Sequence, residues 1–262
     1  MNVFEHPDTT GSWDRIHYDN RAALRYFDRA LALTMRMLEV RPGERVLDAG
    51  CGAGVHSVRV AQAGHPVDAI DISAEAIREA ADRAARAGLA QHIRFAQEDL
   101  TRLSLPDASH ARIFSWGVII HIPDADRAVD ELARILRPGG RLVLSVTNRA
   151  SLEERFKRAV RPLLGKKQPE ETQHMLGTAR YVRLSGGDLW LWRFDIAALV
   201  RHAERRGLRL VDRRAGEFTE LHMFLTGAAR SALFRLNNLW FGWGLPATAA
   251  HTNILTFEKV AR

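Results

Sequence analysis

The sequence contains little cysteine and no long apolar run. Its 262 residues include a single cysteine, Cys51, so no internal disulfide can form, and this usage fits a reducing compartment. The opening residues, MNVFEHPDTTGSWD, have no basic segment followed by an apolar one, which argues against a secretory signal. No apolar stretch reaches the ~18 residues that a membrane span requires. We therefore expect a soluble, cytoplasmic protein.

Two common phosphate-binding patterns are also missing. The chain has no G-x-x-x-x-G-K-[ST] loop. Residues 46–54 read VLDAGCGAG and carry glycine at positions 50, 52 and 54. A dinucleotide fingerprint, G-x-G-x-x-G, would require its third glycine at position 55, which is valine. A pyrophosphate is therefore not the ligand that this loop predicts.

The charge is strongly basic, with a formal net charge of +7. Such an excess fits an anionic partner, which could be nucleic acid, a membrane surface or an acidic small molecule. Most of the excess is arginine scattered along predicted helices, which favours an ordinary solvated surface. The length favours one enlarged domain over two domains.

Helical and strand patterns alternate through the first half of the chain. An amphipathic helix is predicted over 20–39, where Leu24, Phe27, Leu31 and Met35 share one face. Strands are then expected at 44–50, 66–72, 92–100, 111–120 and 141–148, with intervening helices that begin at Val55, at Ser73 as N-cap and at Asp124 as cap. This order predicts an α/β fold with a doubly wound, mostly parallel sheet.

After Asn148 this rhythm breaks. Residues 149–192 are expected to form an irregular insert, basic over 149–167. A helix at 195–206 and a strand at 208–215 follow. A second insert at 218–246 is rich in Phe, Leu and Trp, and 253–260 reads as a final strand.

Three acids follow or end the first three strands. Ligands of open parallel sheets bind beyond the carboxyl ends of the strands, and glycine there lets the backbone approach a ligand closely. Asp71 can accept hydrogen bonds from both hydroxyls of a ribose, Asp99 from an adenine amino group, and Asp48 precedes the glycines. The three carboxylates would repel a pyrophosphate. S-adenosylmethionine, which is cationic and has no phosphate, fits.

Five segments carry a family resemblance over about residues 40–150. They are VLDAGCGAG (46–54), VDAIDIS (67–73), AQEDLTRLSLPD (96–107), IFSWGVIIHIPD (113–124) and LRPGGRLVLS (136–145). Together they resemble the class I S-adenosylmethionine-dependent methyltransferases of the small-molecule type. The resemblance implies a Rossmann-like, seven-stranded sheet whose last strand is antiparallel, with inserts after strands five and six.

The resemblance also implies a set of cofactor contacts near the ends of four strands: Asp48, Gly50, Cys51, Gly52, Gly54, Asp71, Ile72, Asp99, Leu100, Ser115 and Trp116. Asp71 would hold the ribose hydroxyls, with Ile72 beneath the adenine. Ser115 and Trp116 would line the methionine end, although many relatives have a small polar residue in place of Trp116. Cys51 is expected to fill space between the glycines and not to act as a nucleophile.

Two residues are candidates for catalysis. The sulfonium already activates the methyl group, so alignment of the acceptor is the main task of the protein. His121 follows the fourth strand, and an imidazole with its ordinary pKa near 6.5 suits proton abstraction at neutral pH. Its alternative role is packing against the helix that starts at Asp124. Tyr18 lies in the segment SWDRIHYDN, which in relatives often folds over the cofactor.

The resemblance divides residues 1–262 into parts of a single domain. We expect a helical lid at 1–40, a cofactor-binding core at 41–148, and substrate caps at 149–192 and 218–246. The aromatic residues of the second cap, with Trp190, Trp192 and Phe194, predict a hydrophobic pocket in which Arg or Lys could hold an acidic group. A dimer interface, a membrane contact and a plain core are the alternatives.

The function that follows is methyl transfer to an O, N or C nucleophile of a small, hydrophobic or amphipathic metabolite, without a metal. Methylation of nucleic acid, or of a lipid or quinone at a membrane surface, is the alternative. The sequence Ser115-Trp116-Gly117-Val118 stands where amino-methylating nucleic-acid enzymes have N/D/S-P-P-aromatic, which argues against that branch. A cofactor-binding scaffold without activity is a further alternative. Monomer and homodimer both stay open.

Overall fold

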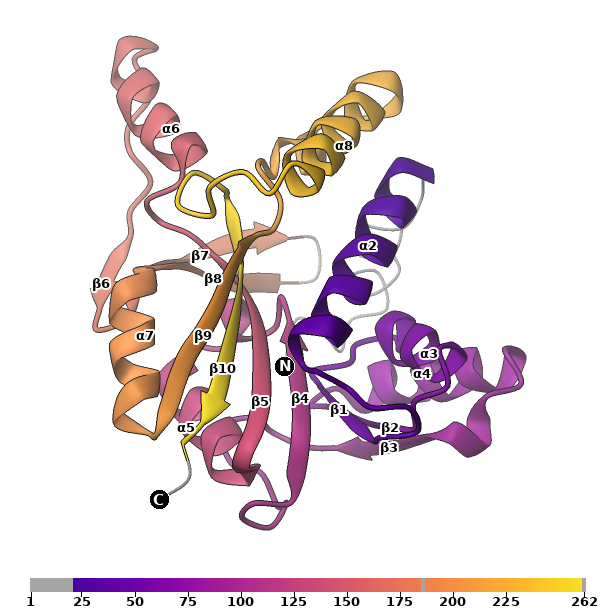
Figure 1. The fold of residues 1–262 in the computed structure, drawn as a ribbon. Helices are drawn as coiled ribbons and strands as arrows, with labels where there is room; N and C mark the ends of the chain where they lie inside the picture. The colour runs from indigo at the N-terminus through magenta and orange to yellow at the C-terminus, as the bar shows by residue number, and fades with distance from the viewer. Residues whose placement is uncertain (1–20, 185–186, 261–262) are drawn as a thin grey trace.

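The computed structural model describes residues 21–184 and 187–260. Its central sheet has seven strands in the order β3-β2-β1-β4-β5-β10-β9, and Figure 1 shows helices on both faces. The strands are β1 (Val46–Ala49), β2 (Val67–Asp71), β3 (Ile93–Gln97), β4 (His110–Trp116), β5 (Leu136–Thr147), β9 (Leu208–Ala215) and β10 (Thr252–Lys259). The five strands from β3 to β5 pair in parallel, and β10 pairs antiparallel with both β5 and β9. The predicted α/β sheet is therefore confirmed.

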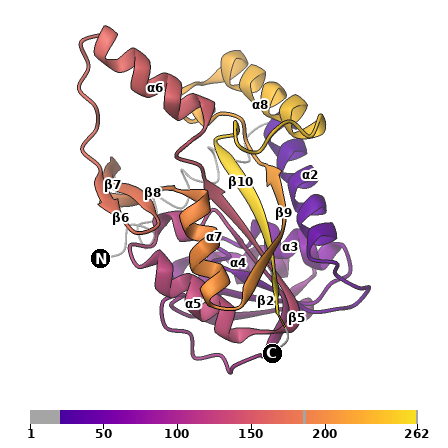
Figure 2. The same ribbon diagram turned by 60° about the vertical axis from the view of Figure 1, so that its left-hand side comes forward.

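Two apolar cores lie on opposite faces of this sheet. Helices α2 (Arg21–Met37), α3 (Val55–Gln62) and α4 (Ala74–Arg86) cover one face, and α5 (Ala125–Ile135) and α7 (Ile196–Arg205) cover the other (Figure 2). Strand side chains alternate between the faces. Along β5, Leu142 and Leu144 join the core beneath α5 and α7, while Val143 joins the core beneath α2 and α3.

The ends of several elements differ from the prediction for local reasons. Ser73 caps α4 as expected, because its hydroxyl accepts the N–H of Ala76. Asp124 precedes α5, but its side chain makes no capping hydrogen bond. β5 begins at Leu136 and not at 141: the pairing with β4 steps from His110–Leu136 to Arg112–Arg141, so the Pro-Gly-Gly stretch is a bulge within the strand.

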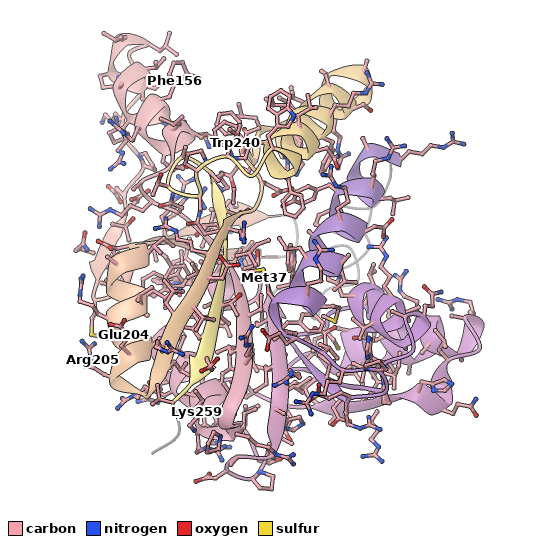
Figure 3. The ribbon with its side chains drawn as sticks, in the orientation of Figure 1. Met37, Phe156, Glu204, Arg205, Trp240 and Lys259 are labelled. Atoms are coloured by element: carbon pink, nitrogen blue, oxygen red, sulfur yellow. The ribbon has the colours of Figure 1, made fainter. Side chains whose placement is uncertain are left out.

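The first insert is not irregular, contrary to expectation. It forms α6 (Leu152–Leu163) and a three-stranded antiparallel sheet of β6 (Thr172–His174), β7 (Gly177–Leu184) and β8 (Gly187–Phe194). The hairpin was hidden in the sequence because both faces of β8 are apolar, aliphatic on one side and aromatic on the other. The α6 helix projects from the body of the protein, and Figure 3 shows Phe156 near its outer part.

The second insert is mostly helical and lies against the first described helix. It contains a short 3-10 helix, η4 (Leu221–Phe224), and α8 (Gly227–Gly242), which packs beside α2 (Figure 1). The rings of Tyr26 and Phe241 meet edge to face at 5.6 Å between centroids. Within the described ranges, no helix has the length and apolar character needed to cross a membrane.

Gly54 is required for the packing of α3 on α4. Its φ is +77°, and an added Cβ would lie 2.7 Å from Cβ of Ala80. We expect Gly54→Ala to destabilise the fold by about 2–4 kcal/mol, the sum of a left-handed backbone penalty and an overpacked contact. Urea unfolding measures this difference.

Gly64→Ala is the matched control, since Gly64 has φ +89° but nothing within 4 Å of its added Cβ. The free energy of unfolding of this variant should fall only by the left-handed backbone penalty, about 1–2 kcal/mol. Equal losses for the two variants would contradict the packing role of Gly54.

Candidate functional site

A cavity of about 700 Å³ follows the edge of the sheet where the parallel strands end. One end is lined from the loops after β1, β2, β3 and β4. The other end is lined from β7, β8, the segment after β9 and the start of β10. Both inserts and α2 therefore meet the sheet around one space, which is where open parallel sheets bind ligands.

The three glycines after β1 serve different purposes. Gly52 lines the cavity with φ +51° and open space where its Cβ would stand. At Gly50 an added Cβ would lie 2.4 Å from a methyl of Val118, so this position allows the loops after β1 and β4 to touch. Gly54 does not line the cavity and packs against Ala80. Only Gly52 therefore offers bare backbone to a ligand without obstruction.

Asp71 shapes the loop and also lines the cavity. Its two carboxylate oxygens accept the N–H of Gly52 and the N–H of Ser73, each at 2.9 Å. Burial raises the pKa of this carboxyl, and the backbone N–H groups of Ser73, Gly52 and Ile72 oppose the shift. A carboxylate can accept about four hydrogen bonds. Asp71 therefore keeps acceptor capacity for a ligand after it has fixed the loop.

Most of the predicted cofactor contacts come together at this end of the cavity. The lining contains Gly50, Cys51, Gly52, Asp71, Ile72, Asp99, Leu100 and Trp116. One oxygen of Asp99 accepts both the N–H and the hydroxyl of Thr101 at 2.8 Å, which orients the side chain. Tyr18 lies outside the described residues.

Asp48 and Ser115 do not line the cavity, although both were expected to contact the cofactor. Ser115 is 1% exposed and Asp48 is 2% exposed. The carboxyl of Asp48 accepts the hydroxyl of Ser57 at 2.6 Å, inside the wall. Burial raises its pKa to about 7, with Ser57 opposing the shift and the charge of Asp71 adding to it. Its influence on a ligand is therefore electrostatic and not a direct contact.

Cys51 has the environment of a structural thiol. Its side chain is buried, and Sγ lies 3.5 Å from the carbonyl oxygen of Gly52. Burial and the nearby charges of Asp48 and Asp71 raise its pKa well above the ordinary value. The thiol therefore stays protonated at neutral pH, and a thiol is a weak nucleophile compared with a thiolate.

His121 lines the cavity from the end of the 3-10 helix η3 (Ile119–His121). Its Nδ1 lies 3.0 Å from the carbonyl oxygen of Trp190 on β8. A carbonyl can only accept, so Nδ1 carries the proton, and in the neutral ring the lone pair is on Nε2. The first insert therefore fixes the tautomer of His121, a long-range contact that the sequence could not reveal.

The expected roof of insert aromatics is wrong. Trp190, Trp192 and Phe194 occupy the face of β8 that packs on the sheet core, where the indole N–H of Trp192 donates to the carbonyl of Ile122 at 2.7 Å. Phe218 and Trp240 stack on each other at 4.2 Å between centroids. None of these five lines the cavity.

The residues that line the other end of the cavity were not predicted. The aliphatic and basic face of β7 and β8, aromatic residues of α2, and polar residues around β9 and β10 contribute Tyr26, Phe27, Arg180, Val182, Leu189, Leu191, Arg193, Glu217, Glu220, His251 and Thr252. Strand alternation in LWLWRF was the available signal, since Leu189, Leu191 and Arg193 share one face.

A buried ion network ties both inserts to the sheet beside this half. Glu153, Glu154, Glu220 and His251 place four ligand atoms within 4.8 Å of one another, close enough for a metal ion. Protein cations already occupy that position: Lys157 lies 2.5 Å from Glu153, and Arg193 lies 2.6 Å from Glu220. We therefore interpret the cluster as a structural network and not as a metal centre. Arg193 is consequently not free to hold an acidic substrate.

The buried carboxyl of Asp48 makes stability depend on pH. The unfolded carboxyl ionises near 3.8 and the folded one at about 7, so the folded state holds more protons between these values, and stability falls as the pH rises through that window. We expect Asp48→Asn, which can still accept from Ser57, to flatten this decline, by on the order of 1 kcal/mol per pH unit. Thermal unfolding measured between about pH 4 and pH 7 gives the pH dependence of stability for each protein. Parallel stability curves for the parent and Asp48→Asn would rule the effect out.

Comparison with known proteins agrees with this geometry. Residues 46–140 match the family model described as a methyltransferase domain. The chain is 38% identical over 138 residues to a 27-O-demethylrifamycin SV methyltransferase of Amycolatopsis mediterranei, covering 51% of this chain and 48% of that protein. It is 35% identical over 148 residues to a ubiquinone biosynthesis O-methyltransferase of Xylella fastidiosa, covering 54% and 56%. The chain thus spans about half the length of these relatives.

Solved structures share the fold over nearly the whole chain. Magnesium protoporphyrin IX methyltransferase from Synechocystis superposes with a TM-score of 0.65 at 18% identity, covering 98% of this chain and 97% of that one. The sheet, the glycine loop with its acids and the matched segment lead to one assignment. The fold is that of the class I S-adenosylmethionine-dependent methyltransferases, and residues 46–140 match a methyltransferase domain.

Proposed function

We propose that the protein transfers a methyl group from S-adenosylmethionine to a hydroxyl oxygen of a small molecule. The observation that carries this proposal is His121, a cavity residue whose Nδ1–H is held by the Trp190 carbonyl, so that Nε2 is the basic nitrogen. The two relatives described above carry O-methylation in their names, which supports oxygen as the acceptor.

The cofactor end of the cavity suits this ligand chemically. Its charged lining residues are Asp71, Glu98, Asp99 and Asp124, and the lining arginines, Arg180 and Arg193, come from the β7–β8 hairpin. A lining in which acids predominate favours a cationic nucleoside and disfavours a phosphate. When bound, the cofactor supplies an electrophilic methyl group on its sulfonium. Asp71 would accept the ribose hydroxyls, and Asp99 would accept the adenine amino group.

The protein then has two tasks at the acceptor. The cavity wall, which includes Trp116 and Phe27, would hold the acceptor hydroxyl in line and exclude water. His121 would take the hydroxyl proton on Nε2 as methyl transfer proceeds. The cavity volume of about 700 Å³ lies within the usual range for small-molecule sites and supports a metabolite over a nucleic acid.

A substrate held at a membrane surface is the second candidate. The projecting helix α6 favours it, because Phe156 is 68% exposed and Leu163 is 84% exposed. Arg155, Arg158 and Arg161 on the same helix would suit anionic lipid headgroups.

Asp71 should be essential for cofactor affinity. We expect Asp71→Asn to weaken binding of adenosylhomocysteine by at least about tenfold, because an amide nitrogen replaces one acceptor that the loop and the ribose share. Isothermal calorimetry measures this affinity. Asp68→Asn is the control, since Asp68 lies on the same strand but pairs with Arg45 at 2.9 Å. Unchanged affinity in Asp71→Asn would count against the ribose role.

His121→Ala should lower kcat by about 10²–10⁴-fold while the affinity for adenosylhomocysteine stays close to that of the parent, because a general base acts on the acceptor and not on the cofactor. Transfer of labelled methyl to a panel of catechols, hydroquinones and hydroxylated macrocycles measures turnover. His92→Ala, at an exposed site, is the control. Equal turnover would remove His121 as the base, and no transfer by the unaltered protein to any acceptor would contradict the proposed function.

A further inference from the structure

Glu217 lines the cavity on the side of β9, away from the loops after β1, β2 and β3. It follows β9, whereas Trp116 ends β4, and the sheet order places β5 and β10 between these strands. Neighbouring strands are about 4.8 Å apart, so β9 lies about 14 Å from β4. A group bound at Glu217 therefore belongs to the end of an acceptor molecule that is remote from the methylated atom.

The backbone around Glu217 is held firmly to the start of β10. The N–H of Glu217 donates to the hydroxyl of Thr252 at 2.6 Å, and the N–H of Thr252 donates to the carbonyl of Glu217 at 3.0 Å. Gly216 allows this approach, because an added Cβ would lie 2.3 Å from the Thr252 hydroxyl. The position of the Glu217 side chain is consequently set by the sheet and not by a mobile loop.

The carboxyl group of Glu217 is left unsatisfied by the protein. Its Oε1 is buried, 3.8 Å from Nε2 of His222, and neither oxygen accepts a hydrogen bond from a residue that the structure describes. The side chain is 14% exposed and lines the cavity. Because Oε1 is buried, this exposure belongs to the rest of the side chain. Oε1 is directed at His222, so the exposed remainder of the carboxyl side chain is the part that can accept from a ligand donor in the cavity.

Its neighbour Glu220 shows the contrast. Glu220 contacts Arg193 at 2.6 Å, His251 at 3.0 Å and Lys157 at 3.2 Å. Lys157 and Arg193 also pair with the two acids of α6: Lys157 with Glu153, and Arg193 with Glu154. Glu217 thus faces the negative charges of Glu220 and Glu153, and among the ion pairs of the described residues the one basic group near its carboxyl is His222, at 3.8 Å.

We propose that Glu217 binds a hydrogen-bond donor, a hydroxyl or a protonated amine, at the remote end of the acceptor molecule, and that it excludes acceptors with an anionic group there. The inference rests on the proposed function for the identity of the acceptor as a small molecule. A hydroxyl or an ammonium would complete the hydrogen bonding of the carboxyl. A carboxylate or a phosphate would meet the charges of Glu220 and Glu153.

The protonation state of Glu217 gives this preference a pH dependence. Burial, then the charges of Glu220 and Glu153, raise its pKa to about 8. Titratable or charged groups pack around it from α2, α6, β8, the segment after β9 and the start of β10: Tyr26, Glu153, Arg193, Glu220, His222 and His251. Above its pKa the carboxylate attracts an ammonium more strongly, whereas a neutral hydroxyl gains little.

Three probes that share a phenol and differ in the group at the other end test the proposal. Tyrosol carries a hydroxyl there, tyramine carries an ammonium, and 4-hydroxyphenylacetate carries a carboxylate. Binding to the full chain loaded with adenosylhomocysteine is measured by ligand-observed NMR. Tyrosol and tyramine should bind at least about tenfold more tightly than 4-hydroxyphenylacetate at neutral pH. The affinity for tyramine should increase relative to the affinity for tyrosol as the pH rises past about 8, where Glu217 becomes ionised.

Two substitutions assign the effect to Glu217. Glu217→Gln keeps a donor and an acceptor, so it should retain tyrosol binding and lose the pH-dependent gain of tyramine. Glu217→Lys should reverse the preference in favour of 4-hydroxyphenylacetate. Glu204→Lys is the matched control, since Glu204 is exposed at the outer end of α7 (Figure 3). Thermal unfolding checks that each variant is folded.

Equal binding of the three probes, no measurable binding of any of them, or an unchanged preference in a folded Glu217→Lys would overturn the proposal. The readout is binding and requires no turnover. If the protein shows the predicted binding preference but transfers no methyl group, the proposed function is wrong and the inference about Glu217 stands. If the protein methylates acceptors but shows no preference among the three probes, the inference about Glu217 is wrong and the proposed function stands.

Discussion

The hydrogen bond between the Gly52 amide and the Asp71 carboxylate holds the cofactor end of the cavity together. The amides of Gly50 and Cys51 donate to the carbonyl of Ile70, and the amide of Gly52 donates to the side chain one residue later. Three consecutive N–H groups of one loop are thus satisfied by the end of β2. The left-handed φ of Gly52 makes this arrangement accessible without strain, and it presents both the open backbone and the acid to the same space.

The two halves of the cavity are built on different physical principles. The cofactor half uses short turns between adjacent parallel strands, so its geometry follows directly from the sheet. The substrate half is assembled from α2, the β7–β8 hairpin and the segment after β9, which are far apart in sequence. Its ion network is paired almost throughout, as buried charges must be. Glu217 is less well paired than Glu220, its neighbour in the same wall, and this difference makes it the candidate for a ligand contact.

The sequence predicted the sheet, the glycine loop and the cap at Ser73 because each is a local pattern of hydrophobicity or turn chemistry. It did not predict which side of a strand end faces the cavity: Trp116 lines it, while the adjacent Ser115 is buried behind it. Strand alternation makes such neighbours diverge, but the register is set by the loops that follow. Nor could local patterns bring Arg193, Glu220 and His251 together, since their meeting depends on β10 lying between β5 and β9.

The interior position of β10 also affects how the protein is made. β9 contacts the rest of the sheet through β10, so the ribosome must deliver residues 252–259 before β9 can join the sheet. Residues up to 147 include every partner of the five parallel strands, so those pairings do not have to wait for residues 252–259. The strand ends that line one end of the cavity can therefore be in place before the segment after β9 and the start of β10, which line its other end, have been made.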